Sequence, residues 1–165
     1  MYEYKINMLS EKMIEFFKYD PKRIQHFMKV HYLSKLICNM ENIDDHTKFI
    51  TECSAIVHDI GIKSAEQKYG KCNGKLQEQE SPKFAKYILE NLDFQKEDIE
   101  RICYIVGHHH TYKNIDELDY QILVEADFLV NFYEEQISEN GIKSVLNKIF
   151  KTDSAKNICR TMYLK

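Results

Sequence analysis

The sequence predicts an all-α fold in a single domain that spans residues 1–165. Apolar residues recur at helical spacing along most of the chain, and no stretch shows the alternating pattern of a strand. Only two prolines and five glycines interrupt this pattern. A chain of 165 residues, 44% of them hydrophobic, can bury one sizeable core. We therefore expect a compact helical bundle.

An apolar repeat and a cap mark the first two helices. The repeat predicts a helix over residues 3–18. Asp20 as N-cap and Pro21 at the first helical position then open a second helix that runs to about residue 40, because this proline lacks an N–H that would be unpaired anyway. His26 shares a stripe of the second helix with Val30, Leu33, Ile37 and Met40. We expect His26 to point inward.

The third helix is predicted from residue 44 to Gly61 and carries the stretch AIVHDIG at its end. Its inward residues are Phe49, Cys53, Ile56, Val57 and Ile60, and Gly61 can close it in the left-handed cap conformation. Residues 62–80 lose the periodicity and hold two glycines and many charges. They predict a long exposed loop, and long ordered loops are often functional.

Further helices are predicted over residues 81–92, 96–108 and 119–138, with short helical pieces after them. The buried face of the 119–138 helix consists of Ile122, Leu123, Ala126, Leu129, Val130 and Tyr133. Asp127 lies on the same face, four residues after Leu123. A buried ionised carboxylate costs several kcal/mol unless it is compensated, so Asp127 needs a partner.

Composition excludes several classes of protein. The net charge of −3 argues against a nucleic-acid polymer as partner. No stretch approaches the roughly 18 apolar residues of a membrane span, and the first residues lack a signal-peptide core. The five cysteines form no CxxC pair, which indicates neither a disulfide framework nor a cysteine zinc site. We expect a cytoplasmic protein with reduced thiols and no membrane partner.

Four polar residues are predicted to point inward from three helices: His26, the adjacent His58 and Asp59, and Asp127. A single histidine on an apolar stripe is more often a core residue, and a single inward aspartate is more often a cap or an ion-pair member. Two imidazoles and two carboxylates together instead suit one divalent ion such as Mn, Fe, Co, Ni, Zn or Mg.

The order H…HD…D, in RIQHFMKV, AIVHDIG and LVEADFLV, resembles the HD-domain superfamily of metal-dependent phosphohydrolases over about residues 21–133. The resemblance implies an all-helical fold and a divalent ion held by His26, His58, Asp59 and Asp127. It also implies hydrolysis of a phosphate ester or anhydride, commonly of a nucleotide, by a metal-activated water. Asp59 would then ligate the metal and orient or deprotonate that water, while His58 and the other two ligands hold the ion.

A second cluster, VGHHHTY, contains His108, His109 and His110, of which at most two can face one site. In dinuclear members of the superfamily a His-His pair binds a second metal, and His109 and His110 match it best. The glutamate that usually follows the pair is Thr111, and the further expected histidine is absent from residues 76–80, LQEQE. These departures argue against a second tightly held metal. We expect this pair to bind substrate phosphate or protonate its leaving group, with a solvated helix end as the alternative.

Anionic substrates also need cations. Arg23 lies one turn before the first histidine, and Lys63 follows the His-Asp doublet by four residues. Either can bind a phosphate, and a solvent-exposed structural role is the alternative for both. Glu66, Gln77 and Glu80 are further candidates for selecting a base or a sugar.

Two functions follow from these residues. The first is a phosphohydrolase acting on a nucleotide or another small phosphorylated metabolite, with a cyclic-dinucleotide phosphodiesterase as the runner-up within this class. The second is a non-catalytic regulatory module that binds metal or nucleotide. The sequence identifies neither the substrate, the number of phosphates nor the metal. A small helical domain rich in Tyr and Phe often pairs, so a homodimer is the assembly we consider.

Overall fold

The structure is a computed structural model that describes residues 1–165 as nine α-helices without a strand, which confirms the predicted all-α class. The helices are α1 (Tyr2–Phe16), α2 (Pro21–Met40), α3 (Asp45–Val57), α4 (Ile62–Tyr69), α5 (Gly74–Asn91), α6 (Lys96–Val106), α7 (Leu118–Glu134), α8 (Glu139–Lys148) and α9 (Asp153–Tyr163). None of them has the length and apolar character that a membrane span requires. All five cysteines are free thiols.

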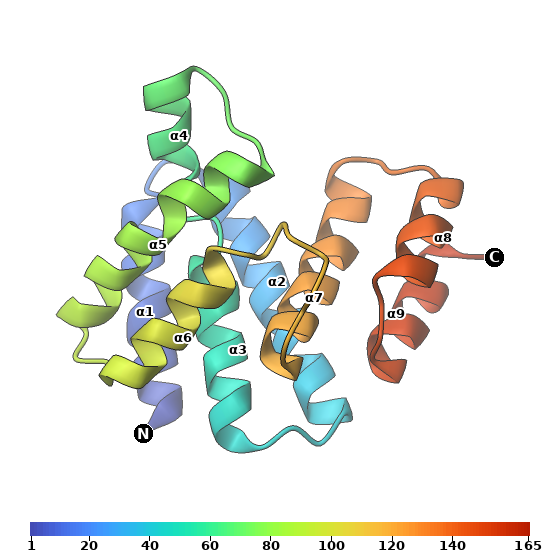
Figure 1. The fold of residues 1–165 in the computed structure, drawn as a ribbon, viewed down its shortest axis with the longest axis horizontal. Coiled ribbons are helices and arrows are strands. Elements are labelled where there is room, and N and C mark those ends of the chain that lie inside the picture. The colour runs from blue at the N-terminus through green and yellow to red at the C-terminus, as the bar shows by residue number, and fades with distance from the viewer.

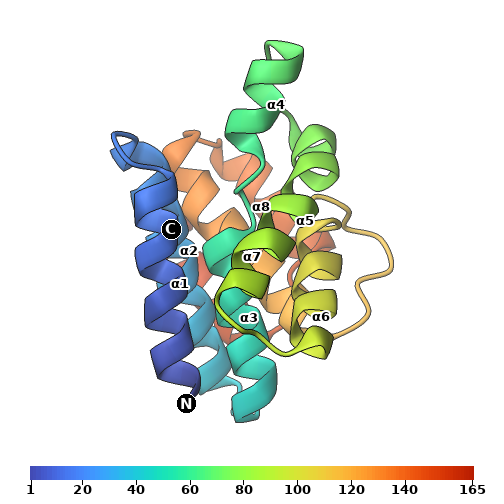
Figure 2. The same ribbon diagram turned by 90° about the vertical axis from the view of Figure 1, so that its left-hand side faces the viewer.

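The centre of the bundle consists of α2, α3 and α7, which all pack against one another. Figure 1 shows these three helices in the middle of the molecule, with α8 and α9 beyond α7. Helix α1 packs on α3, and α5 and α6 form a pair that reaches α3 through α6. Helix α4 projects from one end of the bundle, as Figure 2 shows from the side. One continuous hydrophobic core extends from Ile6 to Cys159.

The starts of several helices follow directly from local sequence. The Asp20 carboxylate accepts a hydrogen bond from the backbone N–H of Arg23, and Pro21 takes the first position of α2, as predicted. The carboxylate of Asp44 caps α3, and the hydroxyl of Ser138 caps α8 in the same way. These caps satisfy backbone N–H groups that have no partner within the helix.

The predicted loop over residues 62–80 is wrong, because this segment contains α4 and the first turns of α5. Buried Glu80 holds the two helices together by accepting hydrogen bonds from Ser64 at 3.0 Å and Lys68 at 2.7 Å. The hydrogen bonds of Lys68 and Lys83 lower the pKa of Glu80 to about 2. Charges that indicated an exposed loop are therefore partly paired within a helical hairpin.

Helix α3 ends at Val57, earlier than predicted, and residues 58–61 form a turn. Gly61 has a φ of −82°, so the predicted left-handed cap is wrong as well. Glycine is needed there for space: a Cβ would lie 2.5 Å from the backbone nitrogen of Ser81 in α5. The turn after α3 can approach α5 this closely only without a side chain.

Other boundaries differ by a few residues. Helix α6 ends at Val106, which leaves the three consecutive histidines in a turn, and α7 ends at Glu134. Two side chains predicted to point inward are exposed, Met40 at 49% and Tyr133 at 75%. Both lie at or next to the last residue of their helices, α2 and α7.

Substituting Gly61→Ala is expected to lower the free energy of unfolding by about 1–3 kcal/mol, because the added methyl group forces α5 away from the turn. Urea unfolding followed by circular dichroism measures this loss. Gly141→Ala is the control, since its Cβ would meet only side-chain atoms that precede α8, Ile137 at 2.9 Å and the Ser138 hydroxyl at 3.4 Å. A Gly61→Ala protein as stable as the wild type would contradict the close approach.

Candidate metal centre

Four polar side chains meet where α2, the turn after α3, and α7 come together. The Nε2 atom of His26 lies 3.2 Å from Nε2 of His58, 3.2 Å from Oδ1 of Asp127 and 3.3 Å from Oδ2 of Asp59. Nε2 of His58 lies 3.4 Å from each of the same two carboxylate oxygens. The structure thus brings together the four residues that the sequence predicts as metal ligands.

The hydrogen bonds of the two imidazoles decide which ring nitrogens face this centre. Nδ1 of His58 donates to the carbonyl oxygen of Ala55 at 2.7 Å. Nδ1 of His26 donates to Oε2 of Glu134 at 2.9 Å. Each Nδ1 therefore carries a proton, and a neutral ring then presents the lone pair of Nε2 to the centre. Two such lone pairs 3.2 Å apart repel one another unless a proton or a cation lies between them.

The spacing of the donor atoms fits a small divalent ion. Zinc, for example, lies about 2.0–2.2 Å from nitrogen and oxygen ligands, which places its ligand atoms roughly 3–3.4 Å from one another. The five distances given above, each of which includes a histidine nitrogen, span 3.2–3.4 Å. Mixed nitrogen and oxygen donors suit borderline divalent cations.

Burial and charge act against each other at this centre. Burial lowers the pKa of His26 and His58, but the facing carboxylates outweigh it and raise both. Burial would raise the pKa of Asp59 and Asp127, and the imidazoles hold both below their ordinary values. Both carboxylates are therefore ionised and require positive charge beside them. A divalent ion would supply that charge in place of the imidazole protons.

Two histidines of the turn after α6 lie next to this centre. Nδ1 of His109 donates to the carbonyl of Val106 at 2.7 Å, and its buried Nε2, which has no hydrogen-bond partner, lies 3.6 Å from Oδ1 of Asp59. Nε2 of His110 bonds to Oε1 of Gln77 in α5. Ligand atoms of Asp59, His109 and His110 all lie within 4.8 Å of one another, so they form a second group able to hold an ion.

His108 belongs to a different environment. Its ring stacks on Tyr104 with the centroids 4.3 Å apart, and its Nδ1 donates to the Tyr104 carbonyl at 2.6 Å. His109 and His110 are thus the two members of the triplet that face the centre. Burial, followed by the charge of His109, lowers the pKa of His110 to about 4, which keeps this ring neutral near pH 7.

The two predicted phosphate-binding cations have different positions. Arg23 lines the cavity above the centre, but its guanidinium already pairs with Asp20 at 2.5 Å and Glu66 at 2.6 Å. Lys63 is not at the site. Its ammonium bonds to the Phe16 carbonyl at 3.3 Å and does not line the cavity, because α4 turns this side chain toward α1.

The centre opens into a polar cavity of about 240 Å³. Its lining comprises Lys22, Arg23, His26, Asp59, Ile62, Gln77, His110, Asp127, Asn131, Glu134 and Glu135. Sequence reasoning missed Asn131, which donates to Oδ1 of Asp127 at 3.0 Å, and Glu134. Their spacing could have identified them, since they follow Asp127 by four and seven residues and so share its helical face.

Comparison with known proteins agrees with this geometry. The family model described as HD domain matches residues 23–147, which include all four residues of the centre. A crystal structure described as a predicted HD superfamily hydrolase from an uncultured Thermotogales bacterium has a TM-score of 0.67 and 21% identity, covering 95% of this chain and 84% of that chain. At this identity the likeness shows the fold alone. A search of curated protein sequences finds no match. Because the family model covers most of the sequence, the chain belongs to the HD-domain family.

Proposed function

We propose that this protein is a metal-dependent phosphohydrolase for small phosphorylated compounds, nucleotides among them. One divalent ion would be held by His26, His58, Asp59 and Asp127. The observation that carries the proposal is the pair of facing imidazole nitrogens, 3.2 Å apart, flanked by the buried carboxylate of Asp127 and the largely buried carboxylate of Asp59 at the base of a polar cavity. Open clusters of this kind suit hydrolysis, because a substrate can reach the ion.

A divalent ion at this centre would make water acidic near pH 7 and offset negative charge that develops on phosphoryl oxygens. The protein would supply the remaining groups. Asp59 turns Oδ2 toward the two histidines of the centre and Oδ1 toward His109. With one oxygen at the centre, its other oxygen can orient an attacking water and accept its proton.

His109 and His110 have complementary features for handling the substrate. Nε2 of His109 is buried and lacks a hydrogen-bond partner, so when this nitrogen also carries a proton the ring can donate it to a phosphoryl oxygen or to the leaving oxygen. His110 is held by Gln77, which fixes its ring at the cavity wall. We assign His109 a catalytic role and His110 a substrate-binding role. A second ion would bind here, between these two histidines and Asp59. The replacement of the usual glutamate by Thr111 and the missing histidine in residues 76–80 argue against such an ion.

The cavity favours a compact, polar substrate. Its volume of about 240 Å³ lies below the roughly 300–1,000 Å³ of typical ligand pockets, and Ile62 is its one apolar lining residue. Lys22 offers positive charge for a phosphate, and Arg23 can do so by exchanging one of its carboxylate partners, while Gln77 and Asn131 offer amides for hydroxyl groups. A nucleoside monophosphate or a sugar phosphate suits this cavity better than a cyclic dinucleotide does.

The function is tested with a panel of nucleotides and phosphorylated metabolites, assayed for phosphate release with Mn²⁺ and with a chelator. We expect metal-dependent hydrolysis of at least one compound, and a rate reduced more than about 100-fold in His58→Ala, which loses a ligand. His46→Ala is the control, because His46 pairs with Asp98 outside the cavity. Hydrolysis that persists with chelator and in His58→Ala would contradict the proposal.

Asp127→Ala is expected to reduce bound metal from about one ion per chain to below about a tenth, because both histidines lose their shared carboxylate. Elemental analysis after dialysis measures the metal, and circular dichroism checks that the helices persist. Asp98→Ala removes a carboxylate from a site outside the cavity and serves as the control. Unchanged metal content in Asp127→Ala would remove this residue from the centre.

A further inference from the structure

We infer that Glu134 is a positioning residue that sets the orientation of His26 in the metal centre, an inference that rests on the metal site of the proposed function. Glu134 is the last residue of α7, and its side chain is 18% exposed. Its Oε2 accepts a hydrogen bond from Nδ1 of His26 at 2.9 Å. Because Nδ1 donates its proton in this hydrogen bond, the opposite nitrogen, Nε2, is directed at His58, 3.2 Å away.

His26 differs from His58 and His109 in what holds its ring. His58 donates its Nδ1 proton to the main-chain carbonyl of Ala55, and His109 donates to that of Val106. Those acceptors belong to the helix or turn that carries the histidine itself. The ring of His26 is instead held by a side chain from another helix, 108 residues further along the chain. The orientation of this one ligand therefore depends on a residue that mutation can remove.

The second oxygen of Glu134 is also engaged. Its Oε1 pairs with the ammonium group of Lys29 at 2.6 Å. Lys29 and His26 lie three residues apart on α2, so both reach the same carboxylate from one face of that helix. The lysine charge offsets a third carboxylate close to Asp59 and Asp127, and the two bonds together restrict the rotamer of Glu134.

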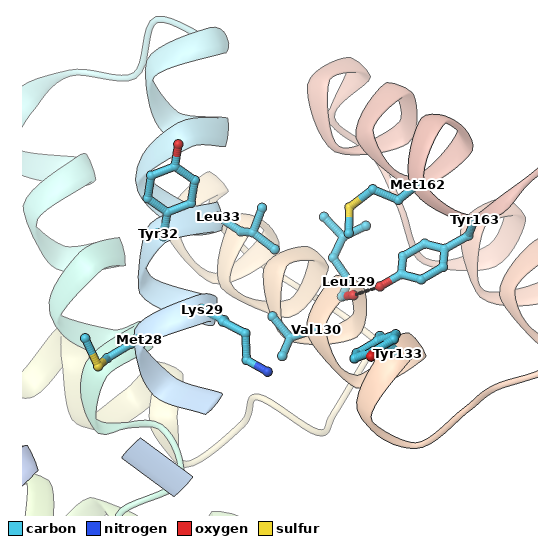
Figure 3. A pocket seen from close by; sticks show the side chains of 9 residues that line it. All are labelled: Met28, Lys29, Tyr32, Leu33, Leu129, Val130, Tyr133, Met162 and Tyr163. Atoms are coloured by element: carbon cyan, nitrogen blue, oxygen red, sulfur yellow. Dashed lines mark hydrogen bonds between the residues drawn. The ribbon is translucent and has the colours of Figure 1, made fainter. Parts of the chain in front are cut away.

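The surroundings of Lys29 favour this pairing. Its stem lines an apolar cavity of about 560 Å³ between α2, α7 and α9. Figure 3 shows Lys29 extending from α2 toward α7 among Leu33, Val130 and Tyr133. This cavity is otherwise lined by hydrophobic residues, so it offers the ammonium no competing carboxylate. Lys29 thus lines the apolar cavity while its partner Glu134 lines the polar one.

The test measures the affinity of the full chain for Zn²⁺ by competition with a chelator. Glu134→Ala is expected to weaken binding by about 10–100-fold, the usual effect of removing a group that orients a ligand. Glu134→Gln is expected to retain most of the wild-type affinity, because its amide oxygen still accepts a hydrogen bond from Nδ1 of His26. Glu135→Ala is the matched control: it removes the same charge from the same cavity without a bond to His26. We expect its affinity to stay within about threefold of the wild type.

A double-mutant cycle separates positioning from general charge. When His26→Ala is already present, adding Glu134→Ala is expected to leave Zn²⁺ affinity unchanged, because the ring that Glu134 orients is gone. An equal loss in both backgrounds, or an equal loss in Glu134→Ala and Glu135→Ala, would overturn the inference and leave the metal site intact. Wild-type protein that binds no Zn²⁺ would overturn both the inference and the proposed function.

Discussion

Two imidazole nitrogens that face one another across 3.2 Å, between the buried carboxylate of Asp127 and the largely buried carboxylate of Asp59, impose the strongest constraint on this fold. Buried charges of this kind cost several kcal/mol unless they are compensated by a partner of opposite charge. The groups come from α2, α7 and the turn after α3, so they compensate one another only while these three segments stay in register.

The turn after α3 explains why a histidine and an aspartate can be adjacent in sequence and still share one site. Neighbouring residues on an α-helix point in directions about 100° apart, so they do not face the same centre. Helix α3 ends at Val57, and the turn lets His58 and Asp59 converge. Gly61 then permits the close approach of α5, which carries Gln77 to the cavity. Local backbone geometry thus places both the ligands and part of the cavity wall.

Much of the centre was predictable because helical periodicity determines which side chains share a face. His26 and Asp127 were found from their places on apolar stripes. The hairpin of α4 and α5 was not predictable in this way, since Glu80 holds it through partners 12 and 16 residues earlier in the chain. The same error misplaced Lys63, whose direction depends on α4. Glu134 was not predicted because it follows Tyr133, the last apolar residue of the buried face of its helix.

The most direct measurement is a crystal structure of the protein grown with Mn²⁺, with data collected to locate the ion by its anomalous scattering. A single ion held by His26, His58, Asp59 and Asp127, about 2.0–2.3 Å from their ligand atoms, is the predicted result. No ion between the two histidines, or one bound only by Asp59, His109 and His110, would contradict the account.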